Sequence, residues 1–178
     1  MTVGKIIAAT RCQKEFTDAL TSGVKVIFDL APDINDVEEK VKKARLNGKK
    51  LFIHLDLATG IGKDESGIVF LKRLGIDGII STRVNIIRSA RENGIFTVQR
   101  FFIVDSHSVA TTLESLKASK ADMIEIMPGA VYKVIKALKE KIDTPIIAGG
   151  LIETATEISE AIRSGATAVS SGKKELWG

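Results

Sequence analysis

Short hydrophobic runs recur along the chain, and each is followed by a stretch with helical spacing. There are eight runs, at residues 6–9, 24–28, 51–55, 78–80, 96–98 (with an extension towards 104), 123–127, 146–148 and 168–169. Between them, apolar residues lie three and four positions apart, as in Val37, Val41 and Ala44, which is the spacing of one helix face. Nearly continuous apolar strands are typical of a parallel sheet buried on both faces. The pattern therefore predicts an α/β protein with eight strands in series.

Eight consecutive strands favour a closed sheet, so we predict a small (β/α)8 TIM-type barrel formed as a single domain over residues 1–178. The chain is shorter than the ~250 residues typical of this fold, and it stops at Trp177 and Gly178, before a full final helix. Something must then cover the groove between the last and first strands. A partner subunit is one candidate, and we expect a homo-oligomer, most simply a dimer.

Glycines occur at the positions where the predicted helices should end. Gly48, Gly75, Gly94 and Gly165 each follow a helical stretch, where a residue in the left-handed conformation commonly ends a helix.

Composition and charge exclude several classes. No apolar segment reaches the ~18 residues of a membrane span, so we expect no membrane partner and a cytoplasmic location. Cys12 is the single cysteine, which excludes an internal disulfide. The formal net charge is +4, which is compatible with a polyanionic partner. No histidine, cysteine and carboxylate spacing typical of a metal site occurs, and we expect neither a metal nor a cofactor.

In a barrel of this type, ligands bind at the carboxyl ends of the strands. With a side-chain period of two, His54 and Asp56 of the third strand should face inward and Ile53 outward. The sixth strand should likewise place Glu125 inside, between Ile124 and Ile126 outside. A carboxylate inside a barrel is costly unless something binds it, so these groups suggest hydroxyl recognition or acid–base chemistry.

A purely structural role for the same groups is the alternative. Asp56 and Glu125 could pair with Arg100 or Lys63 and only hold the barrel together, because buried ion pairs also occur for structural reasons. Periodicity does not decide whether Gln99 or Arg100 faces inward. A lone inward histidine such as His54 is more often a hydrogen-bonded core residue than an acid or base.

Small residues at the ends of the last two strands predict a phosphate site. The seventh strand ends in Gly149, Gly150 and Leu151, and the eighth in Ser170, Ser171 and Gly172. Loops after strands seven and eight commonly hold phosphate in these barrels, because small side chains let backbone N–H groups approach the oxygens. Arg100, Lys63 and Gly129 are further polar or close-approach positions near strand ends.

The residues by themselves leave three functions open. The first is a regulatory module that binds a small phosphorylated ligand. The second is an isomerase or epimerase acting on a sugar or triose phosphate, and the third is a barrel that only supports an assembly. A Schiff-base aldolase is disfavoured, because no lysine lies in the carboxyl half of a strand.

Several segments, in this order, resemble the glycerol-uptake-operon antiterminator family. They are residues 54–57, 78–82, 99–106, 124–129 and 145–152, with the ending 165–171 and 176–177. The resemblance runs from the first strand to the last residue. It departs mildly at Arg83, where a lysine is expected, and at Ser171 and Gly172, which replace a Thr-Ser-type ending.

The resemblance implies a non-enzymatic barrel that senses glycerol 3-phosphate and acts on the leader messenger RNA of glycerol genes to prevent premature termination. Few aromatic residues are available for base stacking, so basic side chains are the candidate RNA contacts, although each group could be only a solvated surface. These candidates are Arg88, Arg91, Lys133, Lys136, Lys173 and Lys174.

Overall fold

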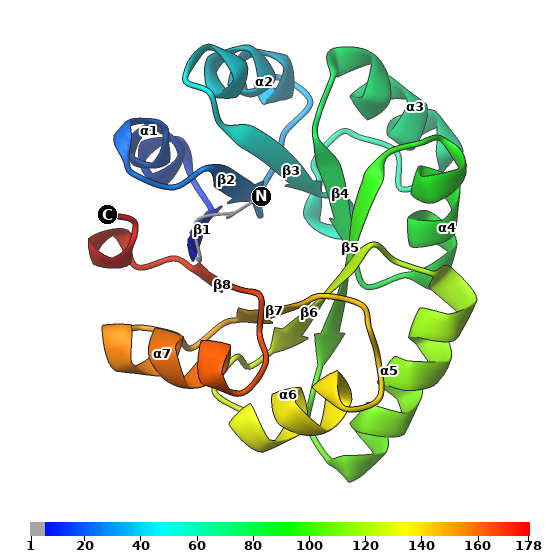
Figure 1. Cartoon of the computed structure of the whole chain (residues 1–178). Coiled ribbons are helices and arrows are strands. Elements are labelled where there is room, and N and C mark those ends of the chain that lie inside the picture. Colours follow the sequence, from blue (N-terminus) through cyan, green and yellow to red (C-terminus); the bar gives the residue numbers. More distant parts are fainter. Residues whose placement is uncertain (1–5) are drawn as a thin grey trace.

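Eight parallel strands close into a barrel in the computed structural model, which describes residues 6–178 (Figure 1). Strands pair in chain order, and β8 pairs with β1 to complete the ring. The predicted barrel is confirmed. The strands are β1 Ile6–Thr10, β2 Val26–Asp29, β3 Lys50–His54, β4 Gly78–Ser81, β5 Phe96–Phe102, β6 Met123–Met127, β7 Ile146–Gly149 and β8 Ala168–Ser171.

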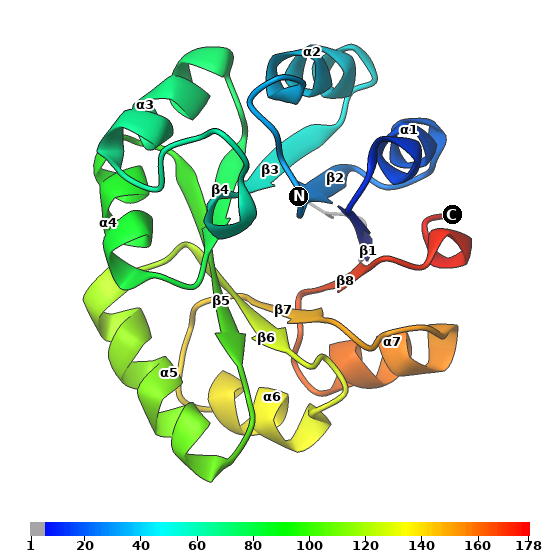
Figure 2. The same cartoon turned by 180° about the vertical axis from the view of Figure 1, so that it is seen from behind.

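Helices surround the barrel, one after each strand except the last (Figures 1 and 2). The connection after β3 contains a short 3₁₀ turn, η1 Leu55–Leu57, and β8 is followed by a second, η2 Lys174–Leu176. The helices are α1 Gln13–Thr21, α2 Val37–Leu46, α3 Glu65–Leu74, α4 Val84–Glu92, α5 Ser106–Ser119, α6 Tyr132–Lys139 and α7 Ala155–Arg163.

Side chains alternate between the barrel interior and the helix layer, as the period of two requires. Ile53, Ile124 and Ile126 pack outward among helix residues, as predicted. Phe52, Val98 and Ile147 belong to a separate apolar cluster inside the barrel. Because Val98 faces inward, Arg100 two residues later faces inward as well, which settles the alternative that periodicity left open. Gln99 faces the helices and accepts a hydrogen bond from Ser119 of α5 at 2.5 Å.

The glycines predicted to end helices do so. Gly48, Gly75, Gly94 and Gly165 all have positive φ, between 65° and 108°. This region is costly for residues with a side chain, and glycine adopts it freely.

The groove between β8 and β1 is covered by the end of the chain itself. Trp177 is buried in the cluster that contains Phe16 and Leu20 of α1, and its Nε1 donates to the Ser171 carbonyl at 2.9 Å. Lys174 pairs with Asp18 of α1 at 3.0 Å. One 3₁₀ turn and a tryptophan thus cover the groove for which a partner subunit was one candidate.

Candidate functional site

A polar cavity of about 390 Å³ opens at the carboxyl ends of the strands, the end of the barrel seen in Figure 2. Its volume lies within the range of small-ligand pockets. Its walls come from the ends of β1, β2, β5 and β6 and from the loops after β7 and β8. The lining residues are Ala9, Arg11, Leu30, Arg100, Glu125, Met127, Gly150, Leu151, Ile152, Glu153, Ser170, Ser171, Gly172 and Lys173.

The floor of the cavity is a buried carboxylate held by two donors. Glu125 is fully buried; Arg100 Nε donates to its Oε2 at 2.6 Å, and Ser170 Oγ donates to its Oε1 at 2.5 Å. Glu125 therefore faces inward as predicted, and it is paired with Arg100 as the structural alternative proposed. The pairing leaves a second lone pair on each carboxylate oxygen, and both residues line the cavity.

Gly149 makes room for this floor and does not line the cavity. A Cβ atom at this position would lie 2.3 Å from Glu125 Oε1 and 2.7 Å from Ser170 Oγ. Any side chain would displace the carboxylate or the hydroxyl. Gly149 was expected at the ligand, and the structure places it beneath the residues that line the site.

The two loops that were expected to hold phosphate lie side by side on one wall of the cavity. Ser171 Oγ donates to the Ile152 carbonyl at 2.7 Å and so ties the β8 loop to the β7 loop. Gly150 and Leu151 both have positive φ, 70° and 56°, and the Leu151 side chain is exposed. Gly129 supports the wall from behind, since its N–H donates to the Gly150 carbonyl at 2.9 Å; it does not line the cavity.

The expectation that Asp56 points into the barrel is wrong. The chain leaves the extended conformation after His54 and forms η1, so the period of two does not continue to Asp56. The carboxylate instead accepts hydrogen bonds from Ser81 Oγ at 2.6 Å and from Thr82 N at 2.7 Å. Burial opposes ionisation, yet these hydrogen bonds hold the pKa of Asp56 below its usual range. Asp56 organises the loop after β4.

His54 is a neutral side chain inside the barrel. It is 3% exposed, and its Nδ1 has no hydrogen-bond partner among the described residues. Burial, followed by the positive charge of Arg100, lowers the pKa of His54 to about 4. His54 does not line the cavity, and neither does Lys63, whose exposed side chain lies in the loop between η1 and α3.

Sequence reasoning missed Arg11. This residue directly follows β1 and lines the cavity, and its Nη1 lies 3.3 Å from where a Cβ of Gly172 would be. The rule applied to the other strands, that polar groups just beyond a strand end face the ligand, would have found it. Lys173 was expected at RNA, but the structure places it in the cavity wall, with its Nζ 3.7 Å from Glu153.

The remaining basic candidates do not form one surface. Arg91 donates to Asp122 at 2.8 Å and to the Lys120 carbonyl, and Lys174 is paired with Asp18. Arg88 lies on α4, whereas Lys133 and Lys136 lie on α6. All three are exposed and take part in no ion pair with another described residue.

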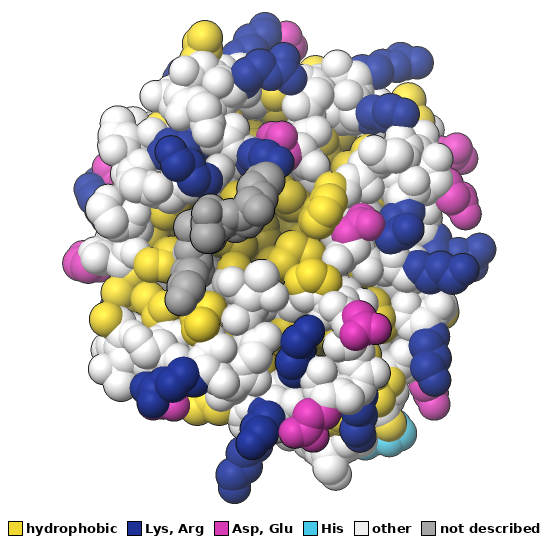
Figure 3. Space-filling view, in the orientation of Figure 1, with side chains coloured by type: hydrophobic (Ala, Val, Ile, Leu, Met, Phe, Trp, Pro, Cys, Tyr) yellow, Lys and Arg dark blue, Asp and Glu magenta, His cyan; other side chains and the backbone are white. Residues whose placement is uncertain are grey.

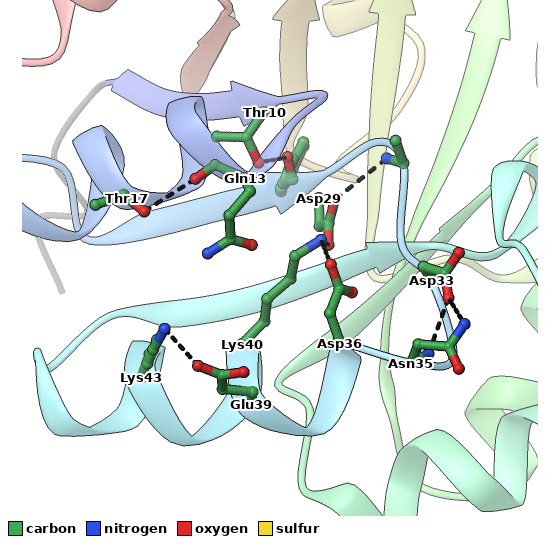
Figure 4. Close-up of polar contacts among 12 residues, drawn as sticks. Thr10, Gln13, Thr17, Asp29, Asp33, Asn35, Asp36, Glu39, Lys40 and Lys43 are labelled. Atoms are coloured by element: carbon green, nitrogen blue, oxygen red, sulfur yellow. Dashed lines mark hydrogen bonds and ion pairs between the residues drawn. The ribbon is translucent and has the colours of Figure 1, made fainter.

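A buried ion pair outside the barrel fixes the loop that follows β2 (Figure 4). Lys40 of α2 reaches Asp29 at 2.9 Å and Asp36 at 3.2 Å. Burial lowers the pKa of Lys40, but the two carboxylates together raise it by more than burial lowers it. The pKa of Lys40 therefore lies above its ordinary value. The pair joins α2 to the end of β2, directly before Leu30 in the cavity wall.

Fold and cavity together define a (β/α)8 barrel with a small polar pocket at the carboxyl ends of its strands. Residues 6–177 match the family described as "Glycerol-3-phosphate responsive antiterminator", and the chain belongs to this family. It is 38% identical over 173 residues to "Uncharacterized protein YgcP" of Escherichia coli (strain K12), covering 97% of this chain and 91% of that protein.

Two solved structures carry related names. The glycerol uptake operon antiterminator regulatory protein of Listeria monocytogenes str. 4b F2365 matches with a TM-score of 0.93 at 34% identity, over 98% of this chain and 95% of that one. A glycerol uptake operon antiterminator-related protein of Thermotoga maritima MSB8 matches with a TM-score of 0.86 at 33% identity, over 97% of this chain and 96% of that one.

More distant matches show the fold alone. A putative deoxyribose-phosphate aldolase from Coccidioides immitis gives a TM-score of 0.75 at 11% identity, covering 96% of this chain and 81% of that one.

Within residues 6–178, no helix is long and apolar enough to cross a membrane.

Proposed function

We propose that this protein is a regulator that binds glycerol 3-phosphate in the cavity and, through that binding, controls antitermination on a leader messenger RNA. Membership of the family supports the regulatory role. The cavity itself carries the ligand proposal. It joins a wall of small residues at the ends of β7 and β8 to a buried carboxylate on its floor.

These two parts suit the two ends of glycerol 3-phosphate. The phosphate lies on the wall formed by Gly150 and Leu151 and by Ser170, Ser171 and Gly172. The hydroxyl groups reach Glu125 and Arg100. An ionised carboxylate accepts hydrogen bonds and a guanidinium donates them, so a diol, which does both, is the matching group.

The test is binding measured by calorimetry and thermal shift. Glycerol 3-phosphate at a hundredfold excess over Kd should stabilise the protein by about 2.7 kcal/mol. Glu125→Gln should weaken glycerol 3-phosphate binding and leave inorganic phosphate binding nearly unchanged, because only the diol contacts the changed group. Equal losses for both ligands would contradict this division of the cavity.

For the RNA, the lysines of α6 are the best-supported of the basic candidates. Lys133 and Lys136 are exposed, and α6 contains no acidic residue. If both contact phosphates, the log–log slope of affinity against salt should change by about −0.7 per contact for a single strand. Lys136→Glu should weaken binding of the leader RNA and reduce that slope.

Lys72→Glu on α3 is the matched control, since Lys72 is an exposed helix lysine that forms no ion pair within residues 6–178. Equal effects of the two variants would remove α6 from the proposal. The titration is made with and without glycerol 3-phosphate, because a ligand changes RNA affinity only if it binds two states differently. Identical RNA affinities in both conditions would overturn ligand control.

We propose further that the cavity binds its ligand without chemical turnover. Lys173, the one lysine among the described lining residues, lies beyond the end of β8 and is half exposed, unlike the desolvated lysine that a Schiff-base mechanism requires. Incubation with triose and pentose phosphates, followed by phosphorus NMR, should show unchanged spectra. A new phosphorus resonance would favour an enzyme instead.

A further inference from the structure

We propose that Arg11 and Lys173 form a clamp for a phosphate dianion at the outer end of the cavity, and that Glu153 competes with the phosphate for Lys173. This inference rests on the proposed binding of a phosphorylated ligand and names the side chains that would recognise its charge. Arg11 comes from the end of β1 and Lys173 from the end of β8. Since β1 and β8 are paired neighbours, the two cations flank one edge of the mouth.

The geometry places Arg11 directly over the small-residue wall. A Cβ on Gly172 would meet Arg11 Nη1 at 3.3 Å and the Ala9 carbonyl at 3.5 Å. Glycine at 172 thus allows the guanidinium to lie against the backbone that would contact phosphate. A guanidinium in this position can donate two parallel hydrogen bonds to phosphate oxygens, which is the strongest form of such contact.

The cations around the cavity differ in how they are paired. Arg100 is matched by Glu125 at 2.6 Å. Lys173 has Glu153 at 3.7 Å, and both side chains of this pair are about half exposed, so the interaction is weak. Arg11 forms no ion pair with a described residue, and only its backbone N–H meets a carboxylate, that of Glu15. One cation without an ion pair among the described residues and one weakly paired cation would suit a phosphate dianion.

Helix ends do not supply this positive charge. After β8 comes only the three-residue turn η2, which is too short to add a useful dipole. At the start of α7, the carboxylate of Glu157 already lies against the N–H groups of Glu153 and Thr154, which precede the helix, at 2.8 and 2.9 Å, so this helix end already carries a negative charge. The phosphate charge must then be balanced by side chains, and Arg11 and Lys173 are the cations at that wall.

A clamp of two cations predicts a preference for the doubly ionised phosphate. The second ionisation of a phosphate ester has a pKa of about 6, so affinity should rise between pH 5.5 and pH 7.5. His54 stays neutral over this range, because its pKa is about 4. The other charged groups around the clamp are Glu15 of α1, Arg100 and Glu125 of the floor, and Glu153 of the β7 loop.

The experiment is calorimetric titration of glycerol 3-phosphate and of inorganic phosphate into the full-length protein at pH 5.5 and 7.5. Arg11→Gln should lower affinity for both ligands by about tenfold to a hundredfold, the range for a hydrogen bond to a charged group. It should also flatten the pH dependence. Arg11→Lys should lose less, because it keeps the charge but not the fork geometry.

Glu153→Gln is the sharpest variant, because its expected effect has the opposite sign. Removing the competing carboxylate should tighten binding of both ligands a few-fold, whereas a merely structural role for the Lys173–Glu153 pair predicts no gain. Lys14→Gln is the control, because Lys14 is exposed on α1 and lies outside the cavity lining. This variant should bind both ligands with the affinity of the unchanged protein.

The outcomes separate this inference from the proposed function. If the unchanged protein binds neither glycerol 3-phosphate nor phosphate, the proposed function fails. If it binds them and Arg11→Gln binds equally well with the same pH dependence, the clamp is overturned. A melting curve shows whether Arg11→Gln is folded. If it is not, Glu153→Gln tests the clamp instead, since unchanged or weaker ligand binding by that variant also overturns it.

Discussion

The two ends of the barrel interior are built from the same eight strands but differ in chemistry. At the carboxyl end, inward positions carry Arg100, Glu125 and Ser170, and a polar cavity opens. At the amino end, a cavity of about 300 Å³ is lined mainly by apolar side chains, among them Phe28, Phe52, Val98 and Ile147. Figure 3 shows this amino end, with hydrophobic side chains gathered near its centre and lysines and arginines around its margin.

The difference shows how one interior divides two tasks. The ring of Phe52 contacts those of Phe28 and Phe96, with centroids 5.5 and 5.8 Å apart, and such packing stabilises the closed sheet. Two residues further along β5, β6 and β8, the interior positions carry Arg100, Glu125 and Ser170, and Glu125 accepts hydrogen bonds from the other two. Stability and ligand recognition can therefore be changed separately, provided that each buried charge keeps its partner.

The largest effect should come from removing one member of the buried pair. Arg100→Met leaves Glu125 buried without a counter-charge, which typically costs about 3–5 kcal/mol of unfolding free energy. The double variant Arg100→Met, Glu125→Leu should recover most of this loss, because it removes both charges. Urea unfolding measures the stabilities and calorimetry the binding. Both variants should lose glycerol 3-phosphate; a double variant no more stable than the single one would contradict the pairing.

A smaller effect on the free energy of unfolding should come from His54 when the pH is lowered. Its folded pKa is about 4, against 6.5 for the ordinary value, so below pH 6.5 the unfolded chain takes up a proton that the folded protein excludes. Stability should therefore fall by about 2 kcal/mol between pH 7.5 and pH 5. His54→Gln should lose this dependence, and His107→Gln, on the exposed first turn of α5, should keep it. Equal pH profiles for the two variants would show that His54 is not the group involved.

The smallest effect should come from the apolar end. Ile147→Val removes one methylene from a buried position and should cost about 0.5–1.5 kcal/mol, with the Kd for glycerol 3-phosphate unchanged. Ser170→Ala at the polar end is the matched variant. It removes a donor to Glu125, so it should weaken ligand binding as well. A change in Kd for Ile147→Val comparable to that for Ser170→Ala would mean that the two ends are not separable.

Much of the molecule follows from sequence pattern. The eight strands, their order, the inward position of Glu125 and the glycines that end helices all follow from local periodicity and backbone preference, because each depends on neighbours within a few residues. The position of the small-residue wall also follows, since parallel strands place all their carboxyl ends at one edge.

Tertiary structure decided what periodicity could not reach. The period of two failed at Asp56 because the chain turned into η1, and a hydrogen bond from Ser81, 25 residues away, then fixed the carboxylate at the end of β4. The inward position of Arg100 was decided by strand register, which pairs it with Glu125. Trp177 covers the groove beside α1, and Lys173 lies in the cavity wall rather than on an outer surface. Arg11 meets Gly172 because closure brings β1 against β8, a contact between residues at opposite ends of the chain that no local pattern contains.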